Sequence, residues 1–450
     1  MSLSSTPIKA RQHAPLEKGL NKFLTPFDLF FKSQSSSGFL LLACAIVAMV
    51  LANSGLKDTY TAINHLPLRI GLGDSTIEHS LHHWVNDGLM VIFFFILGME
   101  IKYEILAGEL RDLRQSVLVI FMAVGGMLIP AAIYFYVAGG VASQGWGIPM
   151  ATDTAFALGA LAILGSRVPR SAAVLLSALA IVDDIGAVLV ISIFYTANIN
   201  FLDFVFAVAT IGVMCLFNLM GVRRPIYYLV GGIILWWWVQ ESGIHPTTAG
   251  ILAAMTVPAR PYTNTQWFSR RMRELLTRFD QLDRPSQSIL EEHRQHDVVE
   301  EVHRVAVQTT TPLQHWNTAL DKPVVFLIVP LFAFLNAGVT LPSNLGAMNA
   351  PVMWATSLGL ILGKGIGISL FAFLALRLGV ARLPEGLQFA QIIGLAFLAG
   401  MGFTMSLFIS ALAFPDNAVL LAQAKLGIIG GSLVAGAVGF SILFQQATRS

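Results

Sequence analysis

The sequence carries little charge. Only 12% of its 450 residues are Asp, Glu, Lys or Arg. Soluble globular domains contain about 25% charged residues, so this shortage excludes an ordinary soluble protein. In place of charge the chain has long apolar runs, and its mean hydropathy is +0.69. Runs of about 20 apolar residues can cross a hydrocarbon core as helices. We therefore expect an all-α polytopic membrane protein.

Three further shortages narrow the function classes. Only two cysteines occur, Cys44 and Cys215, and both lie inside apolar runs. Packing explains such cysteines better than a disulfide or a metal site. No glycine-rich loop of the Walker type is present, which weakens the case for a nucleotide-driven pump. The N-terminal segment is polar and basic, so we do not expect a cleavable signal peptide.

The apolar runs predict twelve membrane spans. We expect them at about residues 37–55, 84–106, 115–138, 148–165, 171–196, 201–221, 225–240, 245–258, 323–340, 352–376, 386–413 and 418–445. The chain is then divided into an N-terminal segment (1–36), spans 1 to 8 (37–258), a polar insertion (259–322), spans 9 to 12 (323–445) and a C-terminal segment (446–450).

Basic residues are missing from one set of connections, and this predicts the orientation. Residues 139–147, 197–200, 241–244 and 341–351 contain no Lys or Arg. The opposite connections contain Lys102, Arg111, Arg114, Arg167, Arg170, Arg223, Arg224, Arg377 and Arg382. Basic residues accumulate on the cytoplasmic side, so both termini are expected to be cytoplasmic.

Two connections are long. On the outer side, residues 66–79 predict a hairpin that turns at Gly73-Asp74. A lone hairpin is marginal in water, so we expect it to pack on another surface, for which a partner subunit is one candidate. On the inner side, the 259–322 insertion has mixed charge and helical stretches, which favours a solvated cytoplasmic helical segment.

Four ionisable residues lie near the middle of predicted spans: Asp153, Asp183, Asp184 and Lys364. Such residues are rare, costly and usually functional. Asp87, Glu100 and Lys425 lie nearer the membrane faces, where an interfacial charge explains them equally well.

Asp183 and Asp184 are adjacent in an otherwise apolar helix. Neighbouring helical residues point about 100° apart, so the two carboxylates face different surroundings. A buried carboxylate must be neutralised, and either a proton or a metal cation can do this. If both compete for the same oxygens, exchange of one for the other follows. Lys364 in turn needs a carboxylate partner on another span, and a purely structural ion pair is the alternative.

Two spans are predicted to be interrupted. Span 4 begins with Pro149 close to Thr152 and Asp153, whose oxygens suit a small hard cation. Span 11 carries two glycines and two hydroxyl groups in GMGFTMS at 400–406. Interrupted helices in both halves of a chain point to the binding site of a transporter, although membrane glycines also serve close packing.

Five motifs carry a resemblance to a known family. They are ATDTAFALG at 151–159, ALAIVDDIGA at 178–187, PLFAFLNAG at 330–338, ILGKGIGIS at 361–369 and GMGFTMS at 400–406. In their order and spacing they closely resemble the bacterial NhaA-type sodium/proton antiporters, over about residues 35 to 445. The resemblance implies twelve transmembrane helices with inverted repeats, in which spans 4 and 11 are discontinuous and cross each other.

The resemblance also implies residue roles. Asp184 matches the principal cation- and proton-binding carboxylate, which holds Na⁺ together with Asp183. Asp183 matches the neighbour that pairs with a lysine, here Lys364, and Thr152 and Asp153 match the helix crossing. The remaining matches are Asp87, an acidic residue of span 2, and the residues tied to pH response, which are Glu100, Lys102, Glu104 and His245.

The chain departs from the family pattern on its cytoplasmic face. Tyr103 follows Lys102 where well-known members have a basic residue, and 259–322 replaces a short loop. Both differences concern the pH profile more than the transport chemistry. The outer hairpin matches the dimerisation element of the family, which implies a homodimer.

The function expected from these features is electrogenic export of Na⁺, and of Li⁺, in exchange for protons across the bacterial inner membrane. It would be pH-regulated, would serve sodium and pH homeostasis, and would need no cofactor, enzymatic activity or nucleic-acid partner. A sodium-coupled symporter of an organic anion on the same fold is the alternative, and a passive channel or membrane sensor is a third possibility.

Overall fold

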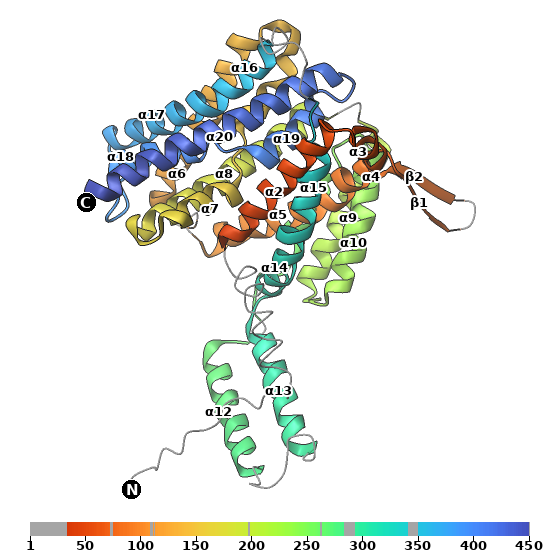
Figure 1. The fold of residues 1–450 in the computed structure, drawn as a ribbon. Helices are drawn as coiled ribbons and strands as arrows, with labels where there is room; N and C mark the ends of the chain where they lie inside the picture. The colour runs from red at the N-terminus through yellow and green to blue at the C-terminus, as the bar shows by residue number, and fades with distance from the viewer. Residues whose placement is uncertain are drawn as a thin grey trace, which may run out of the picture.

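The computed structural model describes residues 34–449, apart from 73–74, 109–110, 112, 197–198, 262, 283–292 and 341–349. Most of the predicted N-terminal segment and the predicted turn at Gly73-Asp74 therefore lie outside the described residues. The described chain is predominantly helical (Figure 1).

Most helices of the first half follow the apolar runs. They are α2 (Gln34–Ala52), α3 (Lys57–Asn64), α4 (Leu81–His83), α5 (Met90–Leu106), α6 (Leu113–Ala138), α7 (Thr154–Leu164), α8 (Arg170–Phe194), α9 (Phe201–Leu219), α10 (Pro225–Glu241) and α11 (Thr247–Thr256). A π-helical turn, Trp84–Leu89, leads into α5, and a 3₁₀ segment, Gly140–Met150, precedes α7.

The second half begins with the polar segment. Its helices are α12 (Thr265–Leu282), α13 (His293–Thr309), α14 (Pro312–Pro323), α15 (Val329–Ala337), α16 (Pro351–Leu358), α17 (Lys364–Arg377), α18 (Phe389–Leu398), α19 (Phe403–Ala413) and α20 (Ala418–Arg449). π-Helical turns join α14 to α15 and α16 to α17.

Seven helices in the described part of the chain are long and apolar enough to cross a membrane, or up to nine if each bent pair is one span. One bent pair is α2 with α3, and the other is α18 with α19, which meet at 48°. The protein is thus a multi-span membrane protein, and the finer count of twelve spans stays a prediction.

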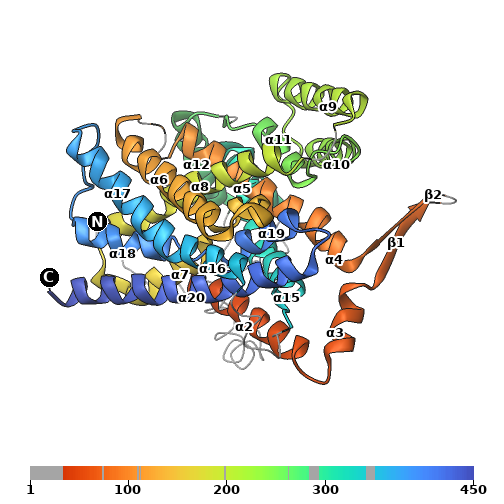
Figure 2. The ribbon, with the colours of Figure 1, turned by 90° about the horizontal axis from the view of Figure 1, so that it is seen from above.

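Two hydrophobic cores organise the bundle, and α8 contributes to both. One core includes Leu176 of α8 with Ile368 of α17 and Leu395 of α18. The other includes Ala187 of α8 with Met99 of α5 and Phe408 of α19. The views in Figures 1 and 2 place α17 and α18 at one end of the bundle and α9 and α10 at the other. Because α8 contributes to both cores, most of its middle residues are buried.

The sheet is a single antiparallel pair in the described residues, β1 (Pro67–Leu72) with β2 (Ser75–Ser80). Arg69 pairs with Glu78 across the strands at 2.8 Å. The indole nitrogen of Trp84 donates to the carbonyl of Leu68 and ties the pair to the start of span 2. Figure 2 shows the two strands extending away from the bundle.

The polar segment forms a helical hairpin of α12 and α13, which projects from one end of the bundle in Figure 1. A small core that includes Leu275, Val298 and Val305 holds the two helices together, and Arg271 forms an ion pair with Glu301. Thr311 then caps α14, which continues through a π-helical turn into α15. The polar segment is therefore joined to a bundle helix without a break.

Helices α6 and α17 approach each other through glycine. A Cβ atom on Gly125 would overlap the carbonyl oxygen of Gly367, and a Cβ atom on Gly367 would overlap the carbonyl of Gly125. Such mutual contact requires small residues on both helices, as is typical of close helix packing in membranes. It holds α17, and hence Lys364, close to the middle of the bundle.

We expect Gly125→Ala to lower the melting temperature in detergent by about 3–8 °C, because overpacking costs about 1–3 kcal/mol. Gly212→Ala on α9 is the matched control, since nothing lies within 4 Å of a Cβ atom there. Equal melting temperatures for the two variants would show that the glycine contact does not limit stability.

Candidate functional site

The two adjacent aspartates of α8 lie in different surroundings. Asp183 and Asp184 are 0% and 4% exposed, in the middle of a helix that spans Arg170–Phe194. Asp183 faces Lys364 of α17, whereas Asp184 lines a cavity. The difference follows from the angle between neighbouring helical residues.

Lys364 and Asp183 form a fully buried ion pair. The Nζ atom of Lys364 lies 2.6 Å from Oδ2 of Asp183, and both side chains are 0% exposed. Thr152 Oγ1 accepts a hydrogen bond from Lys364 at 3.0 Å and lies 2.8 Å from the same Oδ2. The second oxygen of Asp183, Oδ1, is buried without a hydrogen-bond partner. One carboxylate oxygen therefore carries the whole interaction.

Asp153 lies where two helix N-termini converge. It caps α7, with Oδ1 accepting from the amide of Phe156 at 3.2 Å. Its Oδ2 accepts from the amide of Thr404 at 3.0 Å and from the Thr404 hydroxyl at 2.6 Å, near the start of α19. A negative charge is favourable near exposed amides of this kind.

The backbone connects the two predicted interruptions directly. Ala151–Asp153 is not helical, and neither are the two residues before Phe403. Across this gap the amide of Asp153 donates to the carbonyl of Met401 at 2.6 Å, and Thr152 Oγ1 lies 2.9 Å from the carbonyl of Ala399. Groups that would otherwise lack helical partners satisfy one another here.

A cavity of about 520 Å³ reaches this site. Asp184, Asp153, Thr152 and Thr404 line its inner part, and its lining also includes Glu100 of α5. Oδ1 of Asp184 is buried without a hydrogen-bond partner. Carboxylate and hydroxyl oxygens are the ligands that small hard cations prefer, so the chemistry of this set fits Na⁺ or a proton.

The predicted pH-response residues of span 2 do not form one cluster. Glu100 lines the cavity, whereas Lys102 donates to the carbonyls of Met255 and Val257 at 2.7 and 2.5 Å. Lys102 thus caps the C-terminal end of α11, where a cation is favourable. Glu104 lies one turn further along α5 and is partly exposed.

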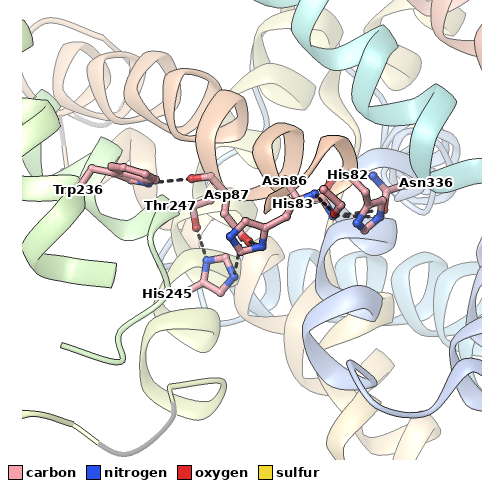
Figure 3. A network of polar contacts seen from close by, with 9 residues as sticks. His82, His83, Asn86, Asp87, Trp236, His245, Thr247 and Asn336 are labelled. Carbon is pink, nitrogen blue, oxygen red and sulfur yellow. Dashed lines mark hydrogen bonds and ion pairs between the residues drawn. The ribbon is translucent and has the colours of Figure 1, made fainter. Parts of the chain in front are cut away.

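Asp87 and His245 meet in a separate polar network (Figure 3). Asp87 contacts Nδ1 of His83 at 2.9 Å and Nε2 of His245 at 3.7 Å. The other ring nitrogen of His245 lies 2.9 Å from the Thr247 hydroxyl, and Trp236 donates to the carbonyl of Asp87. Sequence reasoning missed His83, although its spacing of four residues from Asp87 was a usable signal.

A neighbouring cluster in Figure 3 joins the start of span 2 to α15. Asn336 donates to Oδ1 of Asn86 at 2.9 Å, and His82 Nε2 lies 3.1 Å from Oδ1 of Asn336. None of these residues was singled out from the sequence, and Thr404 was noted only as one of the two hydroxyl groups in the predicted interruption at 400–406. An amide inside the apolar run PLFAFLNAG was the available signal for Asn336.

Comparisons with known proteins show the family of the chain. A family model described as Na⁺/H⁺ antiporter 1 matches residues 28–443. A protein named Na(+)/H(+) antiporter NhaA 1 from Pseudoalteromonas atlantica is 55% identical over 441 residues, which cover 97% of this chain and 93% of that protein. Another of the same name, from Saccharophagus degradans, is 44% identical and covers 94% and 92%.

A solved structure is similar as well. The sodium proton antiporter MjNhaP1 from Methanocaldococcus jannaschii aligns with a TM-score of 0.49 and 14% sequence identity, covering 96% of this chain and 95% of that one.

Removing one partner of the buried pair should destabilise the protein strongly. Lys364→Met or Asp183→Leu leaves an uncompensated charge, at a cost of about 3–5 kcal/mol, so we expect each to lower the melting temperature by about 6–15 °C. The double variant should lose clearly less than the sum of the two, because neither charge remains. Additive losses in the double variant would argue against a direct pair.

His83 should give a pH-dependent contribution to stability. Its hydrogen bond to Asp87 raises the pKa of His83, and partial burial opposes this. Stabilisation by a raised pKa is complete below the unfolded value of about 6.5 and is lost as pH rises through the folded value.

We therefore expect His83→Gln to lower the melting temperature by about 1–2 °C at pH 5.5 and not at pH 9. His296→Gln, on the exposed surface of α13, should change neither value. A loss of the same size at both pH values would mean that the charged form of His83 contributes nothing.

Proposed function

Because the chain belongs to the Na⁺/H⁺ antiporter 1 family and exchanges sodium for protons, we propose that Asp184 is the carboxylate at which the two ions compete. The observation that carries the proposal is that the two neighbouring acids have different partners. Asp183 is neutralised by Lys364, while Oδ1 of Asp184 is buried in the cavity wall without a hydrogen-bond partner. A carboxylate in that position needs a counter-ion or a proton.

The exchange follows from this requirement. When Asp184 loses its proton, Na⁺ or Li⁺ enters the cavity and binds to its oxygens, with Asp183, Thr152 and Asp153 offering further oxygens. When a proton arrives from the other side, it neutralises Asp184 and the cation leaves. Removing water from a charged site costs much free energy, so the empty charged site does not switch between the two sides of the membrane. The sodium and proton fluxes therefore stay coupled.

Lys364 couples the site to a second charge. Its bond to Oδ2 of Asp183 competes with any cation that approaches the aspartate pair. The ion pair breaks as the cation enters, and one of its two groups can then exchange an additional proton. More protons than sodium ions therefore move in each cycle. An extra inward charge lets the membrane potential contribute about 2.3 kcal/mol per 100 mV to sodium export.

We also propose the finer architecture that the family resemblance implies. It comprises twelve transmembrane helices with inverted repeats, in which the 3₁₀–α7 and α18–α19 segments are the two discontinuous spans that cross. The bond between Asp153 and Met401 supports such a crossing. Lys and Arg are concentrated in one set of connections between the spans. This distribution supports an inner-membrane orientation in which both termini and the 259–322 segment are cytoplasmic.

Two further proposals concern regulation and assembly. The Asp87, His83 and His245 contacts and the position of Glu100 in the cavity wall support a pH-regulated activity. Lys102 and Glu104 would act with them through the cytoplasmic end of α5. The strands β1 and β2 extend from the bundle, which supports dimer formation through this hairpin.

The deciding experiment uses proteoliposomes with an acidic interior. Added Na⁺ should dissipate the pH difference with the native protein, without any organic solute, which would also exclude organic-anion symport. We expect Asp184→Asn to reduce the rate at least about 100-fold, since the amide cannot exchange a proton for a cation. Asp416→Asn, in an exposed loop, is the matched control and should leave the rate unchanged. A native response in Asp184→Asn would remove Asp184 from the mechanism.

A further inference from the structure

The helical hairpin of α12 and α13 contains a cavity of its own, of about 380 Å³. It shares no lining residue with the cavity that reaches Asp184. On each helix its lining residues recur at intervals of three and four, so they form one stripe on α12 and one on α13. They include Trp267, Arg270 and Glu274 on α12 and Glu301, Arg304 and Gln308 on α13.

This cavity lies at the end of the hairpin that is nearest to the bundle. The hydroxyl oxygens of Thr263 and Thr309 lie 3.4 Å apart where the hairpin begins and ends. One step closer to the bundle, the amide of Leu313 donates to the carbonyl of Pro258 at 3.3 Å. Pro258 ends a predicted membrane span, and Figure 1 shows the hairpin projecting from the bundle at this place. The cavity is therefore close to the end of a span and open to solvent.

The acids of the lining have a basic partner, whereas two of its arginines have no acidic partner. Arg271, a third arginine of the lining, contacts Glu274 at 3.0 Å and forms an ion pair with Glu301. Arg270 and Arg304 are exposed, and in the described part of the chain neither forms an ion pair with an acidic side chain. Two guanidinium groups from different helices thus border one cavity without a counter-ion.

We propose that this cavity binds a phosphate ester. Guanidinium groups bind phosphate oxygens through paired, charge-assisted hydrogen bonds, so Arg270 and Arg304 would hold the phosphate between the two helices. Gln308 would add the donors of its side-chain amide. The volume of about 380 Å³ lies within the range of pockets for small organic ligands, and it exceeds what inorganic phosphate alone requires. The indole of Trp267, which is 42% exposed, offers an apolar surface to the organic part of the ester.

The proposal goes beyond sodium/proton exchange and does not depend on the role of Asp184. It concerns the 259–322 segment, in which the chain departs from the family pattern. Two sources supply a phosphate ester at this place: a soluble nucleotide or sugar phosphate, and the headgroup of an anionic phospholipid. Both join an anionic phosphate to an organic group, which is the chemistry that the cavity recognises.

The test titrates the full-length protein, in a nonionic detergent and a phosphate-free buffer, with AMP and with dioctanoyl phosphatidylglycerol, and measures dissociation constants by calorimetry. Adenosine, which lacks the phosphate, should not bind. Arg304→Gln should weaken binding about ten-fold, because it removes a charge-assisted hydrogen bond. Glu274→Gln should strengthen binding about three-fold, because it removes a negative charge from the lining while Arg271 keeps its ion pair with Glu301. A gain in affinity of this kind cannot result from a misfolded hairpin.

The matched control is Arg294→Gln, which removes the same charge from the exposed surface of α13, outside the cavity lining, and should leave binding unchanged. Tighter binding of AMP would identify a soluble ester as the ligand, tighter binding of the lipid would identify a headgroup, and both results support the site. Three results would overturn it: no binding of either probe to the native protein up to about 10 mM, native affinity in Arg304→Gln, or an equal loss in Arg294→Gln.

Discussion

The contact between Lys364 and Asp183 is the interaction on which the rest of the site depends. A fully buried lysine is tolerated only with an anion beside it, and a single oxygen of Asp183 meets that need at 2.6 Å. Because this bond joins α17 to α8, the mutual glycine contact between α17 and α6 also serves the site: it holds the lysine at the right depth. The same ion pair occupies Asp183 and leaves the adjacent Asp184 without a basic partner among the described residues.

The non-helical backbone beside the ion pair places a carboxylate against two helix N-termini. Two helices begin at the gap, α7 and α19, and each directs amide hydrogens at Asp153. The negative charge of Asp153 is therefore held by helix ends, just as that of Asp183 is held by a lysine. Three buried carboxylates lie in one region, and two of them have fixed partners. Asp184 differs from both because it lines the cavity and its Oδ1 is buried without a hydrogen-bond donor.

Much of this could be predicted from sequence because it depends on local pattern. The predicted span 171–196 and helix α8 (Arg170–Phe194) nearly coincide. Residues 151–153, close to Pro149, and residues 401–402, among the glycines of 400–406, are not helical. Membrane burial makes every intramembrane charge conspicuous, which singled out Asp153, Asp183, Asp184 and Lys364. That Lys364 faces Asp183 and not Asp184 depends on how α17 packs, and only the family resemblance indicated it.

Residues whose importance arises from tertiary contact were missed for the same reason. Thr404 is an ordinary hydroxyl until the start of α19 is placed against Asp153. Asp321 lines the same cavity as Asp184. In the sequence it is one charge among many in a polar segment, because the sequence does not show that α14 continues into the bundle and packs on α5. A charge pattern separates membrane from water, but it does not show which polar residues border a cavity.

The proposed coupling of two ions depends on the carboxylate oxygens that have no hydrogen-bond partner. Lys364 and Thr152 both contact Oδ2 of Asp183. Oδ1 of Asp183 and Oδ1 of Asp184 are each buried without a hydrogen-bond partner. In the proposed function, a cation that binds Asp184 can also take Oδ1 of Asp183, which has no hydrogen-bond partner. Taking that oxygen weakens the hold of Asp183 on Lys364, since the negative charge is then shared between two cations. In the proposed function, the strength of the Lys364 contact therefore influences the affinity for Na⁺. A tighter ion pair would stabilise the fold and weaken the binding of Na⁺, because both cations share the charge of Asp183.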